Sequence, residues 1–413
     1  MEAIQLDLPL EVLPIKLEEY IDPIIEEIIQ NYSAPGPIGH IDLNEFFAKL
    51  ALKRRPDLEG KRYGVHDPDR GTPLMAVNRL AKECGFDSAM RIEVALNICK
   101  ERKNQGIKKC LECPGLQLAI DDPEMQAEAS ADFFNILEEC NPGIPIAPYG
   151  GIDEAFIGYG QSSFNFDQAF VQFGKTIETV NKKMGRKYGL SVSGCIAPNI
   201  TLAKNGTNFI KEKKDVIWLS MVKVSQVKMF YPWPVEKFHM IGEKTAKRLN
   251  ELGVKTVGQL ASIPLPILKD WLGDARGTQL YLWSHGIDGS LVEPSPPAKS
   301  VGHSVRCKFQ ECEHIQGRMR MMARKVSFDL QKENLEGNKV EVKLEFIRND
   351  KKDSISSQKI LSHYFNDVEI IFKVGTDLLF PLYVEMRVVI KTDIRRVEVR
   401  VQGLRQRSQL RLL

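Results

Sequence analysis

The chain has 413 residues, of which 43% are hydrophobic and 27% are charged. At roughly 100–200 residues per domain, this length indicates a globular protein of two to four domains. The eight cysteines are too scattered for a disulfide scaffold, so we expect a reduced, intracellular protein. No stretch approaches the ~18 apolar residues of a membrane span. Glu2 and Asp7, without an early lysine or arginine, argue against a secretory signal.

Charge is unevenly distributed, although the formal net charge is only +3. Residues 1–35 contain eight acidic residues and one lysine, whereas residues 300–413 contain 22 basic and 15 acidic residues. This asymmetry favours an anionic partner such as nucleic acid. Charge alone leaves a solvated basic surface as an alternative.

The first half of the chain alternates between predicted helices and strands. Residues 17–29 predict an acidic helix that ends before a Pro- and Gly-rich turn at 33–37. A short apolar strand begins at Ile38, and a helix should follow it. The same patterns predict strands at 60–66, 115–120, 144–147, 152–159 and 190–197, and helices at 75–84, 91–101, 123–140, 166–187 and 201–213.

The second half begins with short helices separated by glycine and proline after Trp218. A Pro- and Ser-rich stretch at 293–298 is typical of an exposed linker. Alternating runs at 340–347 and 383–390 predict strands of a sheet, with a packed helix at 315–333. Strands interleaved with helices indicate α/β or α+β organisation.

Three carboxylates lie in or beside predicted apolar strands. Asp42 follows His40 and Ile41 in one strand, and Asp153 and Glu154 are adjacent in another. Adjacent strand residues point to opposite faces, so the last two share a site only at a strand end or a bend. Burying such acids is costly without a compensating cation, and carboxylate oxygens suit magnesium. For either segment alone, a solvent-facing edge strand is the alternative.

Four motifs resemble, in order and spacing, those of the Y-family (translesion) DNA polymerases. His40-Ile-Asp-Leu-Asn-Glu-Phe-Phe-Ala48 resembles the first metal motif, and Gly151-Ile-Asp-Glu-Ala-Phe156 resembles the second. Residues 81–90 are similar to the fingers segment, and residues 192–204 to a late palm motif. The resemblance covers the chain from about residue 38 to its end. It implies an α+β multidomain fold: a right-hand polymerase with an α/β palm, small fingers, a helical thumb and a β-sheet/helix little finger.

The resemblance also implies domain boundaries. An amino-terminal extension with an acidic helix precedes the palm, and a short linker precedes the little finger with its carboxyl-terminal tail. The expected ranges are 1–37 for the extension, 38–46 and 115–212 for the palm, 47–114 for the fingers, 213–290 for the thumb, 291–298 for the linker and 299–413 for the little finger.

By resemblance, Asp42, Asp153 and Glu154 are the catalytic residues and would bind two Mg²⁺ ions, assisted by the carbonyl of Leu43. Such a pair of ions suits attack of a primer 3′-hydroxyl on a nucleotide and departure of pyrophosphate.

The resemblance assigns nucleotide binding to five further residues. Phe46 and Phe47 would lie at the nucleotide, with Phe47 as the steric gate that crowds a ribose 2′-hydroxyl. Lys204 would contact the triphosphate as a point charge. Arg79 and Lys82 occupy the positions where the family's fingers usually present a tyrosine and an arginine. Lysine cannot form the bidentate arginine fork, which puts nucleotide affinity in doubt.

DNA binding is expected from two regions. Residues 238–253 predict a helix, a tight turn and a second helix, similar to the family's helix-hairpin-helix, with Met240 in place of the usual first glycine. Gly242, Lys244 and Thr245 would meet a DNA phosphate at the opening of the second helix. An ordinary helical hairpin is the alternative. The basic residues 299–413 would grip the duplex through its backbone, which makes binding tolerant of sequence and sensitive to salt.

Both ends of the chain resemble the peptide motif that binds the bacterial sliding clamp. Leucines would fill an apolar cleft while glutamine hydrogen-bonds at its edge. Short motifs arise easily by chance, and residues 5–10 would equally suit a strand packed on the body. The expected clamp-binding residues are Gln409, Leu410, Leu412 and Leu413, together with Gln5, Leu6, Leu8 and Leu10.

The resulting hypothesis is a low-fidelity DNA-directed DNA polymerase that uses primer-template DNA, dNTP and Mg²⁺. We further expect a monomer without membrane association, tethered to a sliding clamp in the cytoplasm of a bacterium and associated with the nucleoid. Asn44 and Gly151 also replace the family's usual aspartate and serine. The departures at Asn44, Arg79, Lys82 and Met240 motivate one alternative, a catalytically impaired relative acting as a clamp-bound repair adaptor, although the three intact acids argue against it. A DNA-binding protein without nucleotide chemistry is the other alternative.

Overall fold

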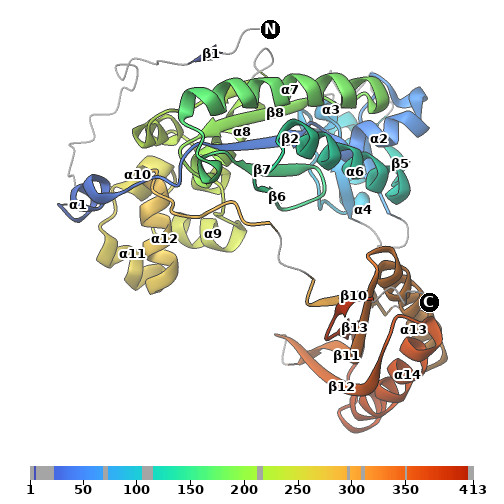
Figure 1. Ribbon diagram of the computed structural model, residues 1–413. Helices are drawn as coiled ribbons and strands as arrows, with labels where there is room; N and C mark the ends of the chain where they lie inside the picture. Colours follow the sequence, from blue (N-terminus) through green and yellow to red (C-terminus); the bar gives the residue numbers. More distant parts are fainter. Residues whose placement is uncertain are drawn as a thin grey trace, which may run out of the picture. The chain divides into compact units, whose positions relative to one another are not determined.

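The computed structural model divides the chain into two compact units, Met1–Ser295 and Pro296–Leu413, drawn in Figure 1. None of the described helices combines the length and apolar character that a membrane span requires. The residues that the structure describes are 4–5, 23–67, 73–104, 115–211, 217–294, 298–307, 312–348 and 351–407.

A six-stranded sheet forms the centre of the first unit (Figure 1). Its middle strand, β2, is buried along its whole length and runs antiparallel to a neighbour on each side. From one edge to the other, the strands are β1 (Ile4–Gln5), β9 (Trp218–Ser220), β8 (Val192–Ala197), β2 (Ile38–Leu43), β7 (Glu154–Gly158) and β6 (Ile146–Pro148).

Helices cover both faces of this sheet. Because strand side chains alternate, Ile41 and Leu43 pack toward α6 (Pro123–Cys140) and α7 (Phe166–Tyr188). His40 and Asp42 face the opposite side and meet α8 (Ile200–Lys211). The alternation therefore brings one acid of the central strand against the helix that carries Lys204 and Lys211.

Local signals account for the helices that cover the sheet. The Asp122 side chain accepts the amide of Met125 and caps α6, which matches the predicted helix at 123–140. Asn165 and Gln168 form a reciprocal capping box at the start of α7. Gly189 ends α7 with φ of 71°, a left-handed conformation that glycine adopts without a Cβ clash.

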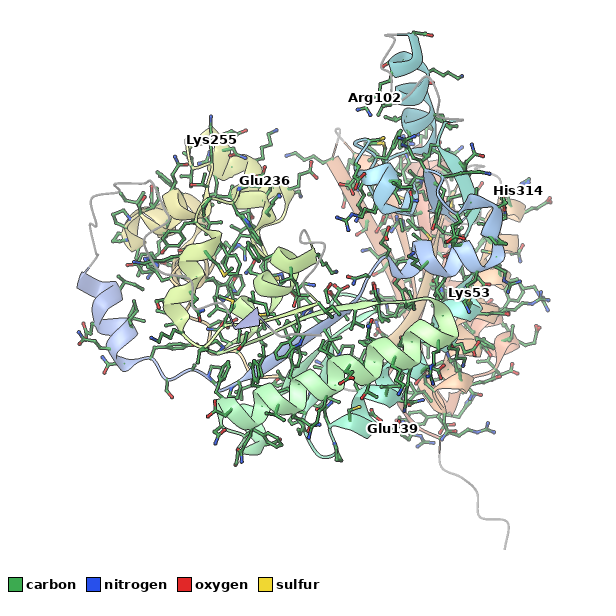
Figure 2. All side chains as sticks on the ribbon, turned by 90° about the horizontal axis from the view of Figure 1, so that it is seen from above. Lys53, Arg102, Glu139, Glu236, Lys255 and His314 are labelled. Atoms are coloured by element: carbon green, nitrogen blue, oxygen red, sulfur yellow. The ribbon has the colours of Figure 1, made fainter. Side chains whose placement is uncertain are left out.

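A three-stranded sheet with order β4-β3-β5 lies beside α2 (Phe46–Arg54). Figure 2 labels Arg102, whose guanidinium donates to the Cys84 carbonyl. Two small apolar clusters support this region. Its elements are β3 (Tyr63–His66), β4 (Leu74–Val77), β5 (Gln117–Ile120), α3 (Arg79–Lys82), α4 (Ile92–Asn104) and the 3₁₀ turn Pro56–Leu58.

The prediction of one helix at 75–84 is wrong. Residues 74–77 form β4 instead, because they pair with β3. The Asn78 side chain then accepts the amide of Ala81, so a helix of only four residues begins at Arg79. A short apolar run has too few turns for its periodicity to distinguish a helix from a strand.

The remainder of the first unit is helical and shares a core with α8. Figure 2 labels Glu236 and Lys255 in this region. The helices are α1 (Pro23–Asn31), the 3₁₀ helices Val224–Phe230 and Val235–Lys237, α9 (Glu243–Glu251), α10 (Val257–Ala261), α11 (Leu265–Leu272) and α12 (Asp274–Ser284); a further 3₁₀ turn, Gly160–Ser162, follows β7.

Only part of the predicted helix, turn and helix at 238–253 is present. The second helix is α9, but the element before the turn is the 3₁₀ helix Val235–Lys237, which ends before Phe238. Met240 has φ of 69° and thus takes the left-handed conformation that usually calls for glycine. The turn is therefore formed at a non-glycine residue.

The second unit packs α13 (Cys312–Lys332) and α14 (Val368–Val384) on one core with an antiparallel sheet of order β10-β13-β11-β12. The helix predicted at 315–333 and the strand at 340–347 are confirmed. The strands are β10 (Ser300–Arg306), β11 (Leu335–Arg348), β12 (Lys351–Phe365), β13 (Ile394–Gln402) and β14 (Arg405–Gln406).

The strand predicted at 383–390 is wrong. Residues 383–384 end α14, and Glu385–Val389 forms one π-helical turn. The Ile390 amide donates to the Glu385 carbonyl, and Met386 is fully buried in the core of the second unit. Burial of Met386 at the end of a long helix therefore overrides the local alternation.

Candidate active site

Two of the three predicted acids face each other across neighbouring strands. In the register of β2 and β7, Asp42 lies directly opposite Glu154. Asp153 precedes the first residue of β7 and lies in a bend, and its carbonyl accepts the amide of Leu43 at 2.9 Å. The strand end thus allows the adjacent Asp153 and Glu154 to belong to one site.

Two lysines of α8 reach these acids. Lys211 Nζ lies 2.5 Å from Asp42 Oδ2. Lys204 Nζ donates to the carboxylate of Glu154 and lies 3.7 Å from Asp42 Oδ2. Lys204 was predicted, but Lys211 was not. Its sequence signal is the seven-residue spacing from Lys204, which places both side chains on one helix face.

The pKa values of Asp42 and Asp153 are raised despite the nearby lysines. Burial raises the pKa of Asp42 above its ordinary value, an effect that Lys211 opposes. Burial, followed by the charges of Asp42 and Glu154, raises the pKa of Asp153 to about 6. Both shifts come first from burial, and a cation bound beside these carboxylates would oppose them.

His40, on the same strand as Asp42, contacts the site with a buried side chain. Its ring is completely buried, and burial lowers its pKa well below the ordinary value, so the imidazole is neutral. Nδ1 lies 3.0 Å from the Thr207 hydroxyl, and Nε2 lies 3.5 Å from Glu154 Oε2. His40 therefore packs against Glu154, the cross-strand partner of Asp42.

The phenylalanines after Asp42 have different environments. Phe46 is buried with 2% of its surface exposed, whereas Phe47 is half-buried, and their rings meet edge to face at 5.2 Å between centroids. Phe46 is thus a core residue that supports the ring of Phe47. This arrangement leaves Phe47 as the one available to a ligand.

Arg79 and Lys82 lie one helical turn apart on α3, and both are exposed. Arg79 forms an ion pair with Glu83 at 3.5 Å. Among the ion pairs of the described residues, neither cation pairs with the three acids. The structure therefore does not bring the predicted fingers cations into contact with the acidic site.

The opening of α9 is accessible. Gly242 precedes the helix without a side-chain cap, a Cβ at this position would meet no atom within 4 Å, and Lys244 is exposed while Thr245 is half-buried. Close to it, the Tyr149 hydroxyl lies 2.9 Å from His239 Nε2 and donates to the Met240 sulfur at 3.1 Å. Tyr149 therefore links the loop before Asp153 to the turn before α9.

The predicted clamp-binding residues lie mostly outside the described part of the chain. Ile4 and Gln5 form β1, which pairs in parallel with β9. Of the amino-terminal motif at 5–10, the structure describes only Gln5, so the alternative of a packed strand is not tested beyond that residue. The residues outside the description are Leu6, Leu8, Leu10, Gln409, Leu410, Leu412 and Leu413.

Comparison with known proteins identifies the family. Two models of the impB/mucB/samB family match residues 41–208 and 298–412, the second as its C-terminal domain. A model described as the thumb domain of DNA polymerase-iota matches residues 240–288.

Curated relatives agree with these models. DNA polymerase IV of Oceanobacillus iheyensis is 25% identical over 81% of this chain and 75% of its own length. DNA polymerase IV 2 of Bacillus subtilis is 28% identical over 70% of this chain and 65% of its own. A solved Y-family DNA polymerase chimera, Dbh-Dpo4-Dbh, matches with a TM-score of 0.66 at 20% identity, over 89% of this chain and 98% of the chimera.

The fold and these matches define a right-hand polymerase with palm, fingers, thumb and little finger. The chain belongs to the Y-family of translesion DNA polymerases.

Proposed function

We propose that this chain is a DNA-directed DNA polymerase that performs low-fidelity, template-directed synthesis by two-metal nucleotidyl transfer. The observation that carries the proposal is the cross-strand pairing of Asp42 with Glu154, with Asp153 adjacent and Lys204 and Lys211 beside them. The reaction is attack of a primer 3′-hydroxyl on the α-phosphate of a dNTP, with release of pyrophosphate.

The donor set fits a divalent cation chemically. Asp42, Asp153 and Glu154 provide only oxygen atoms, with the Leu43 carbonyl as a further candidate, and hard cations such as Mg²⁺ prefer oxygen ligands. Among the described residues, however, no group of three acidic, histidine or cysteine side chains is arranged to hold a metal. The carboxylates instead meet the two lysines, which a bound cation would displace.

Bound Mg²⁺ would supply charge neutralisation and an activated primer oxygen. The chain's own residues have complementary tasks. Once displaced from the acids, the ammonium groups of Lys204 and Lys211 can turn to the triphosphate, since both lie on the same face of α8. Phe47 would exclude a ribose 2′-hydroxyl, and Arg79 and Lys82 would approach the outer phosphates after movement of the fingers.

DNA would bind mainly through its phosphates. The free amides that open α9, at Glu243 and Lys244, suit a phosphate at a helix amino terminus. The second unit adds its excess of basic residues. Contacts of this kind do not read bases, which suits synthesis on any template. Clamp binding through either terminal motif, and a monomeric state, remain predictions.

Primer extension with Mg²⁺, the four dNTPs and a primed template tests the proposal. Wild type should extend the primer, and Asp153→Asn should reduce kcat by at least about a hundredfold because the amide is a poor substitute for a charged ligand. Asp132→Asn is the matched control, since Asp132 pairs with Lys187 on the palm surface. Absence of extension by wild type would overturn the proposal.

A second candidate is a catalytically impaired clamp-bound adaptor. It is motivated by Lys204 and Lys211, whose ammonium groups contact the acids, and by Arg79 and Lys82 at the fingers positions where the family usually has other residues. This candidate predicts no incorporation by wild type but retention of primed DNA. A DNA-binding protein without nucleotide chemistry predicts, in addition, that dNTP with Mg²⁺ leaves the melting temperature of the DNA complex unchanged.

A further inference from the structure

Glu45 adopts a left-handed backbone conformation between the strand that carries Asp42 and the helix that carries Phe47. Its φ and ψ are 52° and 36°. An L residue with a side chain is strained in this region, and such residues cluster at functional sites. The position therefore requires a compensating interaction or a function.

The side chain of Glu45 does not stabilise its own helix. Glu45 precedes α2 as its cap residue, yet it makes no side-chain capping hydrogen bond there. Its carboxylate instead accepts the backbone amide of Arg79, the first residue of α3 in the fingers. A shorter capping residue such as serine or asparagine would satisfy the amides of α2, whereas the longer glutamate stem reaches a different element.

The Arg79 amide has few alternatives. Asn78, which precedes it, uses its side-chain oxygen for the amides of Ala81 and Tyr63 and its amide nitrogen for the Lys61 carbonyl. The Glu45 carboxylate thus completes the amino terminus of a helix that has only four residues.

The bond connects two parts of the proposed site. Glu45 lies three residues after Asp42 and two before Phe47, while α3 carries the exposed cations Arg79 and Lys82. On the palm side, Asn44 is held in turn by the hydroxyl of Ser193, which donates to its side chain at 2.9 Å. The backbone next to Asp42 is therefore tied to the palm sheet at one residue and to the fingers at the next.

We propose that Glu45 is a positioning residue that sets α3, and with it Arg79 and Lys82, for nucleotide binding. The inference rests on the proposed polymerase function. It requires that loss of the carboxylate weakens dNTP binding while chemistry at Asp42 is preserved, and that an isosteric acceptor at residue 45 preserves both.

Four variants test this. Glu45→Ala and Glu45→Gly remove the acceptor, and Glu45→Gly also relieves the left-handed backbone. Glu45→Gln retains an acceptor oxygen. Glu59→Ala is the matched control, because Glu59 is an exposed acid that makes no hydrogen bond to α3 among those described. Burial first raises the pKa of Tyr63, and the charges of Glu45 and Glu59 both add to this effect, so the two acids lie near the same ring. Single-nucleotide incorporation gives kcat and KM for dGTP.

Loss of one hydrogen bond should raise KM for dGTP roughly five- to tenfold in Glu45→Ala and Glu45→Gly, with kcat within about twofold of wild type. Glu45→Gln and Glu59→Ala should stay near wild type. Glu45→Gly should nevertheless be more stable to urea than Glu45→Ala, because glycine adopts the left-handed backbone without strain. A raised KM in Glu45→Gly without a loss of stability therefore marks a positioning role for the side chain. An unchanged KM in Glu45→Gly overturns the inference.

Hydrogen–deuterium exchange separates failure of this inference from failure of the proposed function. In the absence of substrate, amides 79–82 should exchange faster in Glu45→Ala than in wild type, Glu45→Gln or Glu59→Ala. This result supports the link even if wild type incorporates no nucleotide. Equal exchange in all four proteins contradicts the link, whatever the activity.

Discussion

Lys211 and Asp42 form an ion pair of 2.5 Å between Nζ and Oδ2, and Asp42 is one of the acids to which we assign a divalent cation in the proposed function. Asp42 is nearly inaccessible, with 8% of its side chain exposed, whereas Lys211 is 33% exposed. The lysine can therefore leave toward solvent, but the acid cannot. If the proposed function holds, the pair would compete with the metal for the same oxygen.

Lys211→Met should test this competition. Without the ammonium, the acids repel each other and the metal-free protein should lose unfolding free energy, by less than the about 3–5 kcal/mol of a fully buried pair because Lys211 is 33% exposed. Millimolar MgCl₂ should then raise the melting temperature of the variant more than that of wild type. Lys175→Met, at an exposed position of α7, serves as the control. Equal shifts in wild type and Lys211→Met would contradict the competition.

Phe47→Ala should admit ribonucleotides. The half-buried ring of Phe47 lies against the buried Phe46, five residues after Asp42 in the chain. Loss of its bulk should reduce the preference for dNTP over rNTP by at least about tenfold, since a pocket discriminates by steric exclusion. The ratio of kcat/KM for dGTP and GTP measures the effect, with Phe47→Tyr as the control. Unchanged sugar discrimination would refute the gate assignment.

Met240→Gly should stabilise the turn before α9. Met240 has φ of 69°, which costs an L side chain roughly 1–2 kcal/mol. Replacement should raise the free energy of unfolding relative to Met240→Ala by about 1 kcal/mol, because both variants lack the side chain and only alanine retains the backbone cost. Urea denaturation measures this difference. Equal stability of the two variants would show that the turn relaxes at no cost.

His239 should make the first unit sensitive to acid. Burial, reinforced by the charge of Lys204, lowers the pKa of His239 to about 4, whereas an unfolded histidine titrates near 6.5. Between these two values the unfolded chain binds a proton at residue 239 that the folded chain does not. Stability is therefore lost as the pH falls through this window, and above it this residue adds no pH dependence.

His239→Gln removes this contribution. Between about pH 7 and pH 5, the free energy of unfolding of wild type should fall by about 2 kcal/mol more than that of the variant. Urea denaturation of wild type and variant at the two pH values gives the four free energies of unfolding. A difference between wild type and variant that does not change with pH would show that the imidazole is not the group responsible.

The amino-acid sequence alone predicted the candidate site residues and most elements around them. Asp42, Asp153 and Glu154 became candidates because a carboxylate in an apolar strand is costly, and the resemblance of their two motifs to the family's metal motifs selected them. The helix at 123–140 could be predicted because its cap and its periodicity are both local signals.

Tertiary structure decided what depends on contacts between distant residues. The strand at 74–77 exists through its pairing with β3, and the π-helical turn at Glu385–Val389 through burial of Met386. The pairing of Lys211 with Asp42 follows from the packing of α8 on the sheet, and the reach of Glu45 to Arg79 from the approach of α3. Local sequence patterns indicate which secondary structure each segment prefers. Only the packing of distant segments decides which ion-pair and hydrogen-bond partners its charged groups and amides find.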